Sequence, residues 1–135
     1  MNLAQYLEDS ARRHPDKAVF RFEGQQITFQ EFDIACNGLA HGLSELGLAP
    51  GDRALVMMPN SIQQATIYYA LAKIGAIVVP VSFLYRTHEL EHILADSKPK
   101  IFIGAEPYLG EIKKVLKKGD GPPIKIALGA KEDQV

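Results

Sequence analysis

The stretch RALVMMPNSIQQATIYYALAKIGAIVVPV, residues 53–81, decides the fold class of this sequence. Its first part, residues 53–58, is apolar after the leading arginine and is typical of a strand that is buried on both faces. Ser61 can cap the helix that follows, and Gly75 is positioned to stop that helix. Residues 76–81 form a second apolar run. A strand–helix–strand unit of this kind predicts two parallel strands joined by a right-handed crossover.

The same region raises the alternative of a membrane-spanning helix. Between Ser61 and Tyr85 the only charged residue is Lys73, and a stretch of this length could cross a bilayer. A charge near the middle of the membrane is costly, and Gly75 and Pro80 interrupt a helix. We therefore expect a buried helix followed by a buried strand, and no transmembrane segment.

Two helices and a hairpin are predicted before this unit. Residues 2–13 have the spacing of an amphipathic helix, and residues 18–27 indicate two short strands joined by a turn. Thr28 and Glu31 form a capping box for the next helix, and Gly47 is its expected C-terminal cap. The apolar stripe of that helix is formed by Phe29, Phe32, Cys36, Leu39, Leu43 and Leu46.

Helices and strands also alternate after residue 81, where Thr87 is predicted to cap the next helix. The predicted elements are a helix over residues 87–97, a strand over 100–103, a helix over 107–118, a strand over 124–128 and a frayed tail over 129–135. This alternation predicts an α/β fold with a largely parallel sheet. We expect a single domain over residues 1–135.

Composition narrows the class of protein. The chain has 135 residues, a formal net charge of −1, 47% hydrophobic residues and 23% charged residues, which is an ordinary globular balance. The near-zero charge gives no global reason to expect nucleic acid as a partner. The single cysteine excludes a disulfide or a cysteine-based metal cluster within one chain. The first residues contain no apolar signal core, so a cytoplasmic protein is expected.

The segment HELEH matches the zinc-binding pattern H-E-x-x-H. On a helix, His88 and His92 share a face and could bind zinc, with Glu89 as general base. Glu106 and Glu111 are the nearby candidates for a third ligand. The competing interpretation is a solvated helix start in which Glu89 favours the positive end of the helix dipole. The position directly after the predicted cap favours this second interpretation.

The remaining polar motifs have plain interpretations. No glycine belongs to a phosphate-binding loop of the G-x-x-x-x-G-K-[ST] or G-x-G-x-x-G type. His41 is expected on a helix surface, Cys36 as an inert core thiol, and Gly38 and Gly42 as a strip that allows another element to approach closely. A basic run lies near a helix end and consists of Lys113, Lys114, Lys117 and Lys118. This run favours a solvated helix face, and the alternative interpretation is a binding site for a nucleotide or an acidic partner.

Four segments carry a family likeness in their order and spacing. They are NLAQYLEDSARRHPDKAVF (2–20), ITFQEF (27–32), LGLAPGDRALVMMPNS (46–61) and ALAKIGAIVVPVSFLYRTHELEHILADSKPKIFI (70–103). Together they resemble the start of the AMP-forming acyl-CoA synthetases, members of the adenylate-forming superfamily that includes fatty-acyl-CoA ligases. The resemblance implies that the predicted fold is part of the N-terminal domain of such an enzyme. It also places HELEH where the family has Glu-Leu at a helix start without metal.

The resemblance implies a function for the whole enzyme. Such enzymes join a carboxylate to ATP, release pyrophosphate, and transfer the acyl group from the adenylate to coenzyme A. It implies ATP, Mg²⁺ and CoA for the whole enzyme, but no catalytic residue, no metal ligand and no cofactor in this chain, because the phosphate loop, the metal and ribose ligands and the catalytic lysine lie further along. Arg86 is the nearest candidate for contact with the CoA phosphate, and its alternative interpretation is an exposed loop arginine.

Three hypotheses about function follow. The first is an N-terminal piece of an acyl-CoA synthetase that is inactive alone. The second is a non-catalytic α/β module for binding or assembly, and the third is a zinc hydrolase of the H-E-x-x-H type. The expected partner is the remainder of the synthetase, or a second copy that associates through the uncovered sheet.

Overall fold

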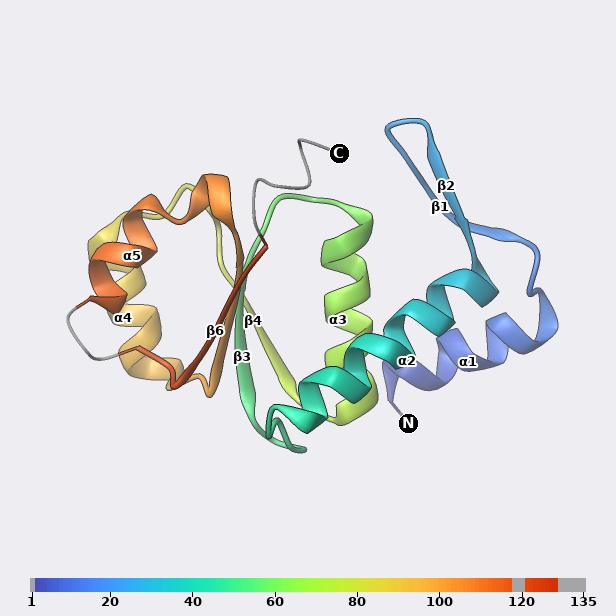
Figure 1. The fold of residues 1–135 in the computed structure, drawn as a ribbon, viewed down its shortest axis with the longest axis horizontal. Helices are drawn as coiled ribbons and strands as arrows, with labels where there is room; N and C mark the ends of the chain where they lie inside the picture. Colours follow the sequence, from blue (N-terminus) through green and yellow to red (C-terminus); the bar gives the residue numbers. More distant parts are fainter. Residues whose placement is uncertain (1, 118–120, 129–135) are drawn as a thin grey trace. The chain divides into compact units, whose positions relative to one another are not determined.

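The computed structural model describes residues 2–117 and 121–128, and the predicted tail over 129–135 lies outside them. The described residues form two compact units (Figure 1). Unit 1 comprises the chain up to Gly51 together with Asn60–Ala76, and unit 2 comprises Asp52–Pro59 together with the chain from Ile77 onward. Each unit has its own core, and each is described by itself.

Unit 1 consists of three helices and a two-stranded antiparallel hairpin. Its elements are α1 (Leu3–Arg13), β1 (Ala18–Phe22), β2 (Gln25–Thr28), α2 (Phe29–Glu45) and α3 (Ile62–Ile74). The capping box at Thr28 is confirmed, since the Thr28 hydroxyl accepts from the Glu31 N–H at 3.2 Å and Glu31 accepts from the Thr28 N–H at 2.9 Å. Ser61 caps α3 as predicted, and Gly75 ends it with a φ of 84°, a left-handed conformation that glycine adopts without strain.

The core of unit 1 is built around Phe32 on α2, which is fully buried. Its ring makes edge-to-face contacts with Phe20 of the hairpin and Tyr69 of α3, with centroids 5.0 and 5.4 Å apart. Cys36 is also fully buried beside it. The predicted stripe is wrong at its end, because Leu46 is exposed: α2 ends one residue earlier and the chain turns away there.

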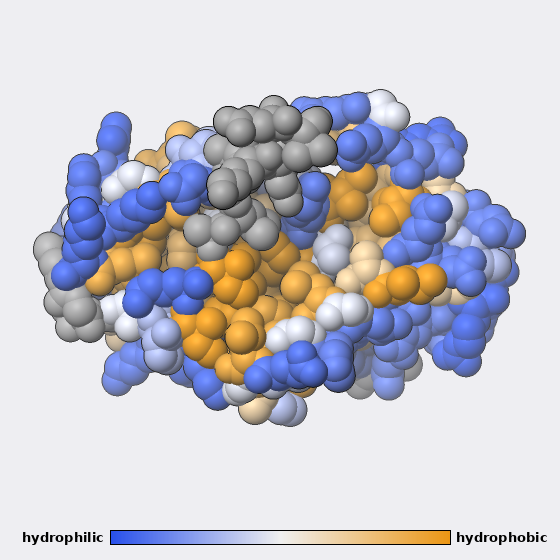
Figure 2. All heavy atoms as spheres, in the orientation of Figure 1, coloured by the Kyte–Doolittle hydropathy of each residue, from blue (hydrophilic) through white to orange (hydrophobic). Residues whose placement is uncertain are grey.

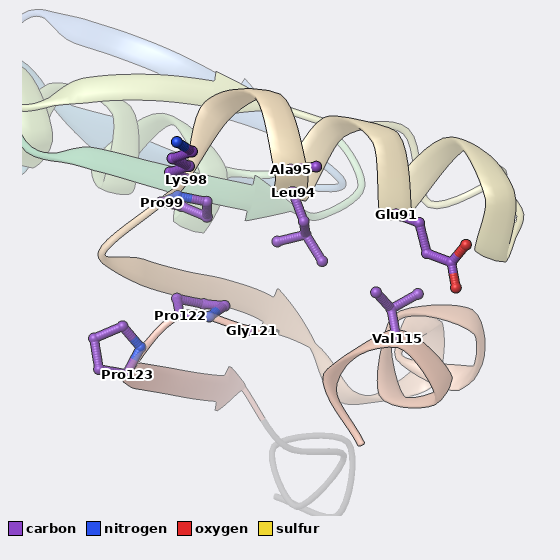
Figure 3. A pocket seen from close by; sticks show the side chains of 9 residues that line it. All are labelled: Glu91, Leu94, Ala95, Lys98, Pro99, Val115, Gly121, Pro122 and Pro123. Carbon is purple, nitrogen blue, oxygen red and sulfur yellow. The ribbon is translucent and has the colours of Figure 1, made fainter. Parts of the chain in front are cut away.

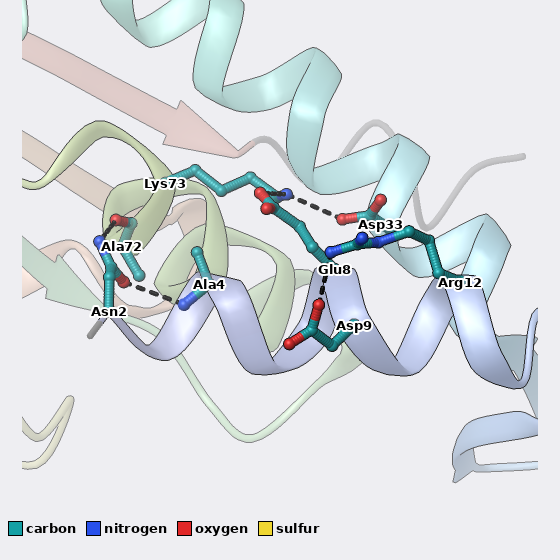
Figure 4. Close-up of polar contacts among 8 residues, drawn as sticks. All are labelled: Asn2, Ala4, Glu8, Asp9, Arg12, Asp33, Ala72 and Lys73. Atoms are coloured by element: carbon teal, nitrogen blue, oxygen red, sulfur yellow. Dashed lines mark hydrogen bonds and ion pairs between the residues drawn. The ribbon is translucent and has the colours of Figure 1, made fainter.

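Lys73, the lone charge of the apolar stretch, holds the three helices of unit 1 together (Figure 4). Its side chain is only 7% exposed, and its ammonium lies 2.8 Å from Glu8 Oε1 on α1 and 2.8 Å from Asp33 Oδ1 on α2. Burial alone would lower the pKa of Lys73, but the two carboxylates outweigh it and the pKa is raised. In addition, the Asn2 amide that caps α1 donates to the Ala72 carbonyl of α3.

Unit 2 is a four-stranded, fully parallel sheet in the order β4-β3-β5-β6, and the predicted α/β fold class is confirmed. Its elements are β3 (Arg53–Met57), β4 (Ile77–Pro80), α4 (Thr87–Ser97), β5 (Ile101–Ala105), the short 3₁₀ helix η1 (Glu106–Tyr108), α5 (Gly110–Leu116) and β6 (Ile124–Leu128). In Figure 1, α4 and α5 lie together on one side of this sheet.

The central strands carry the core of unit 2. Residues 54–57 of β3 are all buried, as the apolar run predicted, and so are the first four residues of β5. Gly104 on β5 is required by close packing, because a Cβ there would lie 2.5 Å from Phe102 Cζ and 2.8 Å from Leu109 Cδ2. The strand predicted to be buried over 76–81 is β4, which lies at an edge of the sheet formed by the described strands and is only partly buried, with Ile77 47% exposed.

Other differences from the predictions are local. Apart from the backbone of α2 itself, no described atom lies within 4 Å of a Cβ placed on Gly38 or Gly42, so none of the described elements approaches closely at these glycines as predicted. The helix predicted over 107–118 is divided, because Leu109 packs into the core between η1 and α5. Of the helices in the described part of the chain, none combines the length and the apolar character needed to cross a bilayer.

Candidate functional site

Arg86 lies where ligands bind in most open α/β sheets, beyond the carboxyl ends of the parallel strands. It follows the loop after β4 and immediately precedes α4, with 79% of its side chain exposed. The guanidinium Nη1 lies 3.8 Å from Glu111 Oε1 of α5. The predicted candidate residue is therefore accessible, and a carboxylate stands beside it.

Glu111, a residue of α5, hydrogen-bonds to the N-terminal end of α4. Its Oε2 accepts from the Thr87 N–H at 3.0 Å and from the Thr87 hydroxyl at 2.7 Å, while Oε1 lies 2.8 Å from Lys114 Nζ. These contacts with Lys114 and Thr87 lower the pKa of Glu111 to about 2. The prediction that Thr87 is the N-cap is wrong by one residue: Arg86 occupies the cap, and the Thr87 hydroxyl binds Glu111 instead.

The H-E-x-x-H residues do not converge on a metal site with the predicted third ligands. His88 and His92 are exposed on α4, and Glu89 accepts a hydrogen bond from the Arg86 N–H at 2.9 Å. Glu106 pairs with Lys113 at 2.8 Å, and Glu111 is engaged as described. Within residues 2–117 and 121–128, no group of three or more His, Cys, Asp or Glu side chains is arranged to hold a metal ion.

The positive charge of the basic run on α5 is partly neutralised by carboxylates of α5 and of the preceding 3₁₀ helix η1. Lys113 and Lys114 both pair with carboxylates, whereas Lys117 is exposed and Lys118 lies outside the described residues. On α2, His41 is exposed and its Nε2 lies 3.2 Å from Glu45 Oε1. Burial raises the pKa of the Cys36 thiol to about 12, so this cysteine stays protonated near neutral pH.

A cavity of about 630 Å³ opens at the opposite, amino-terminal edge of the sheet (Figure 3). Pro99 precedes β5, and Pro122 and Pro123 precede β6, and all three line the cavity together with apolar side chains of α4 and α5. Figure 3 shows the Glu91 carboxylate beside Val115 and the Lys98 side chain pointing away from the cavity. Among the described residues that line this cavity, the charged side chains are Glu91 and Lys98, and no serine, threonine, cysteine or histidine accompanies them.

The parallel sheet and the helices on its face define an open α/β domain, a class in which ligands commonly bind beyond the carboxyl ends of the strands. The sequence profile described as AMP-binding enzyme matches residues 7–134, nearly the whole chain. The chain therefore belongs to the AMP-binding enzyme family, and the resemblance to adenylate-forming acyl-CoA synthetases is confirmed.

Two curated relatives and one solved structure place the match within that family. A long-chain-fatty-acid–CoA ligase of Bacillus subtilis is 41% identical over 101 residues, covering 75% of this chain and 18% of the ligase. The phosphinothricin tripeptide synthetase PhsC of Streptomyces viridochromogenes is 40% identical over 91 residues, covering 67% of this chain and 8% of the synthetase. The N-terminal domain of FACL13 from Mycobacterium tuberculosis superposes with a TM-score of 0.88 at 29% identity, over 97% of this chain and 34% of that domain.

The chain thus spans less than a fifth of these two curated relatives, and it corresponds to part of an N-terminal domain. A fatty-acid ligase and a peptide synthetase match it almost equally well, at 41% and 40% identity. The matched region is therefore common to relatives whose names indicate different products.

Proposed function

We propose that this chain is the N-terminal scaffold of an AMP-forming acyl-CoA synthetase and that it is inactive alone. The observation that carries the proposal is the family match over residues 7–134, together with the small share of each relative that the chain covers. The whole enzyme would join a carboxylate to ATP and pass the acyl group from the adenylate to CoA. In the whole enzyme this chain would contribute part of the sheet and its helices, and the remaining residues would contribute the catalytic groups.

The described residues do not fit ATP or Mg²⁺. Phosphate binding requires converging backbone N–H groups or cations, but at the carboxyl edge the Thr87 N–H and the Lys114 ammonium are already bound by Glu111. Magnesium would require a cluster of oxygen ligands, and in the described ranges no group of three or more His, Cys, Asp or Glu side chains is arranged to hold a metal ion. We therefore derive no catalytic step from these residues.

Arg86 is the residue we propose as a contact for the phosphate of CoA in the whole enzyme. Its exposure and its place beyond the strand ends support this role. The neighbouring Glu111 carboxylate opposes an incoming anion, while Lys114 offsets that charge. The contact would thus be a single, exposed charge–charge interaction that helps to orient CoA.

The isolated chain is expected to give no ATP–pyrophosphate exchange with any carboxylate. Charge that develops on the triphosphate needs positioned N–H groups, cations and metal, and these are not offered by the described residues. A chimera tests the scaffold role: this chain replaces the matching segment of the Bacillus subtilis ligase, and exchange with a long-chain fatty acid is expected. In that chimera Arg86→Ala should raise KM for CoA severalfold and leave the exchange reaction unchanged.

Two outcomes of these assays contradict the proposal. Carboxylate-dependent exchange by the isolated chain, above a no-protein control, would show that it carries its own active site. A chimera that is folded by circular dichroism yet inactive would show that the chain is not an interchangeable scaffold. The second result would favour a non-catalytic binding or assembly module.

We propose further that, without the rest of the enzyme, the chain associates with a second copy through the outer edge of β4. This edge strand is apolar, Ile77 is half exposed, and an open strand edge is a template for pairing. Sedimentation velocity should show a mass that rises with concentration, and Ile77→Lys should abolish the rise. Ile34→Lys, at an exposed isoleucine on α2, is the matched control. A monomer at all concentrations would exclude this association.

A further inference from the structure

Arg86 is an unusual residue for the N-cap of a helix, the position that it occupies on α4. Ser, Thr, Asp and Asn are the usual N-cap residues, because their side chains accept hydrogen bonds from the first N–H groups of the helix. A guanidinium can only donate, and here its positive charge lies at the positive end of the helix dipole. The N-terminal end of α4 therefore depends on acceptors from other residues.

Two carboxylates supply such acceptors on either side of Arg86. Glu89, in the first turn of α4, accepts from the Arg86 N–H at 2.9 Å. Glu111, on α5, accepts from both the N–H and the hydroxyl of Thr87, at 3.0 and 2.7 Å. Glu111 therefore ties the start of α4 to a second helix.

The backbone, rather than side-chain packing, determines where the Arg86 guanidinium lies. The chain before Arg86 turns at Ser82, whose hydroxyl accepts from the Leu84 N–H at 3.1 Å and whose carbonyl accepts from the Tyr85 N–H at 3.2 Å. The Arg86 side chain itself is 79% exposed, and Figure 2 shows hydrophilic side chains where α4 and α5 begin. Any contact that fixes this backbone therefore also fixes the origin of the side chain.

Glu111 acts on Arg86 by two routes of different strength. The direct route is weak, because Glu111 Oε1 lies 3.8 Å from Arg86 Nη1, beyond hydrogen-bond distance, and an exposed ion pair contributes little. The route through Thr87 consists of two hydrogen bonds to a carboxylate whose side chain is 23% exposed. Lys114 lies 2.8 Å from Oε1 and offsets the negative charge beside the guanidinium. An anion can therefore bind Arg86 while Glu111 keeps its bonds to Thr87.

We infer that Glu111 is a positioning residue: through Thr87 it fixes the start of α4, from which Arg86 contacts the phosphate of CoA. A fixed backbone reduces the conformational freedom that the exposed side chain loses when it binds its ligand. The inference rests on the proposed function in one respect, namely that Arg86 contacts CoA.

Substitutions of Glu111 in the Bacillus subtilis chimera test the inference. Glu111→Ala removes the bonds to Thr87, so KM for CoA should rise severalfold with little change in kcat. Glu111→Gln keeps an acceptor for Thr87 and removes the charge, so KM should return to the original value or fall below it. Glu106→Ala is the matched control, because Glu106 pairs with Lys113 and its loss should leave KM unchanged.

Two further measurements separate positioning from general stabilisation. In the double variant Arg86→Ala/Glu111→Ala, KM should be no higher than in Arg86→Ala alone, whereas independent effects would multiply. Hydrogen exchange of the full chain provides a readout without CoA. The Thr87 amide should lose protection in Glu111→Ala and keep it in Glu111→Gln.

Three results would overturn the positioning role. A lower KM in both Glu111 variants would show that Glu111 only repels CoA, and multiplied effects in the double variant would show a general loss of structure. Retained protection of the Thr87 amide in Glu111→Ala would show that this bond does not hold α4.

The same assays distinguish this inference from the proposed function. A raised KM in Arg86→Ala beside an unchanged KM in Glu111→Ala overturns the positioning role alone. An active chimera in which Arg86→Ala leaves KM unchanged overturns the CoA contact, and the positioning role falls with it. A folded, inactive chimera overturns the scaffold role, and hydrogen exchange at Thr87 still decides whether Glu111 holds α4.

Discussion

Replacing Lys73 by methionine is expected to lower the free energy of unfolding by about 2–3 kcal/mol. Methionine keeps the apolar stem of the side chain but leaves Glu8 and Asp33 without their shared cation. Breaking a fully buried ion pair costs about 3–5 kcal/mol, and the 20% exposure of Asp33 and 46% exposure of Glu8 reduce that cost. Urea unfolding at low protein concentration measures the loss.

Lys113→Met is the matched control for this prediction. Lys113 and Glu106 lie at the same 2.8 Å separation, but both side chains are exposed. An exposed pair contributes about 0–1 kcal/mol, so the control should lose little stability. Adding Asp33→Asn to Lys73→Met should recover part of the loss by removing one unpaired carboxylate. If Lys73→Met costs no more than Lys113→Met, the three-helix ion pair does not stabilise unit 1.

Phe32→Ala is expected to have the largest effect of any single substitution proposed here, a loss of about 3–5 kcal/mol. The ring is fully buried and meets Phe20 and Tyr69 edge to face, so its removal leaves a cavity and two unpartnered ring contacts. Since a typical domain is stable by about 5–15 kcal/mol, this loss is a large fraction of the stability, and the midpoint of thermal unfolding should fall by about 10 °C or more. Thermal melts followed by circular dichroism measure the change.

Phe22→Ala provides the comparison for Phe32→Ala. Phe22 ends strand β1 of the same hairpin, but its side chain is exposed. Its truncation should cost less than about 1 kcal/mol, as for most surface changes. Equal losses at both positions would mean that the hairpin, rather than the aromatic cluster, determines the stability of unit 1.

Much of the fold was predictable because its signals are local. The cap at Ser61, the stop at Gly75 and the apolar run of β3 each depend on neighbouring residues, and the structure contains all three. The burial of β4 was not predictable in this way. An apolar run indicates a strand, but whether that strand is central or at an edge depends on the order β4-β3-β5-β6, which is set by contacts distant in sequence.

The contacts of the candidate site were likewise not predictable from neighbouring residues. Arg86 was a candidate only through the family resemblance, whereas Glu111 was considered only as a zinc ligand. The bond from Thr87 to Glu111 spans 24 positions of sequence, and no local pattern indicates it. The role of Lys73 is similar: a single charge in an apolar helix signals a buried partner, but the partners Glu8 and Asp33 are on two other helices.

The interleaving of the two units has a consequence for the newly made chain. Strand β3 belongs to unit 2 but is synthesised between α2 and α3 of unit 1. At about 5–20 residues per second, Tyr69 and Lys73 leave the ribosome roughly one to six seconds after α2 is complete. During that interval Phe32 lacks one of its aromatic partners and Asp33 lacks its cation, while β3 emerges with no parallel neighbour. Nascent chains of this protein therefore pass through a period in which apolar surface from both units is exposed together, and this is the period in which a chaperone would act.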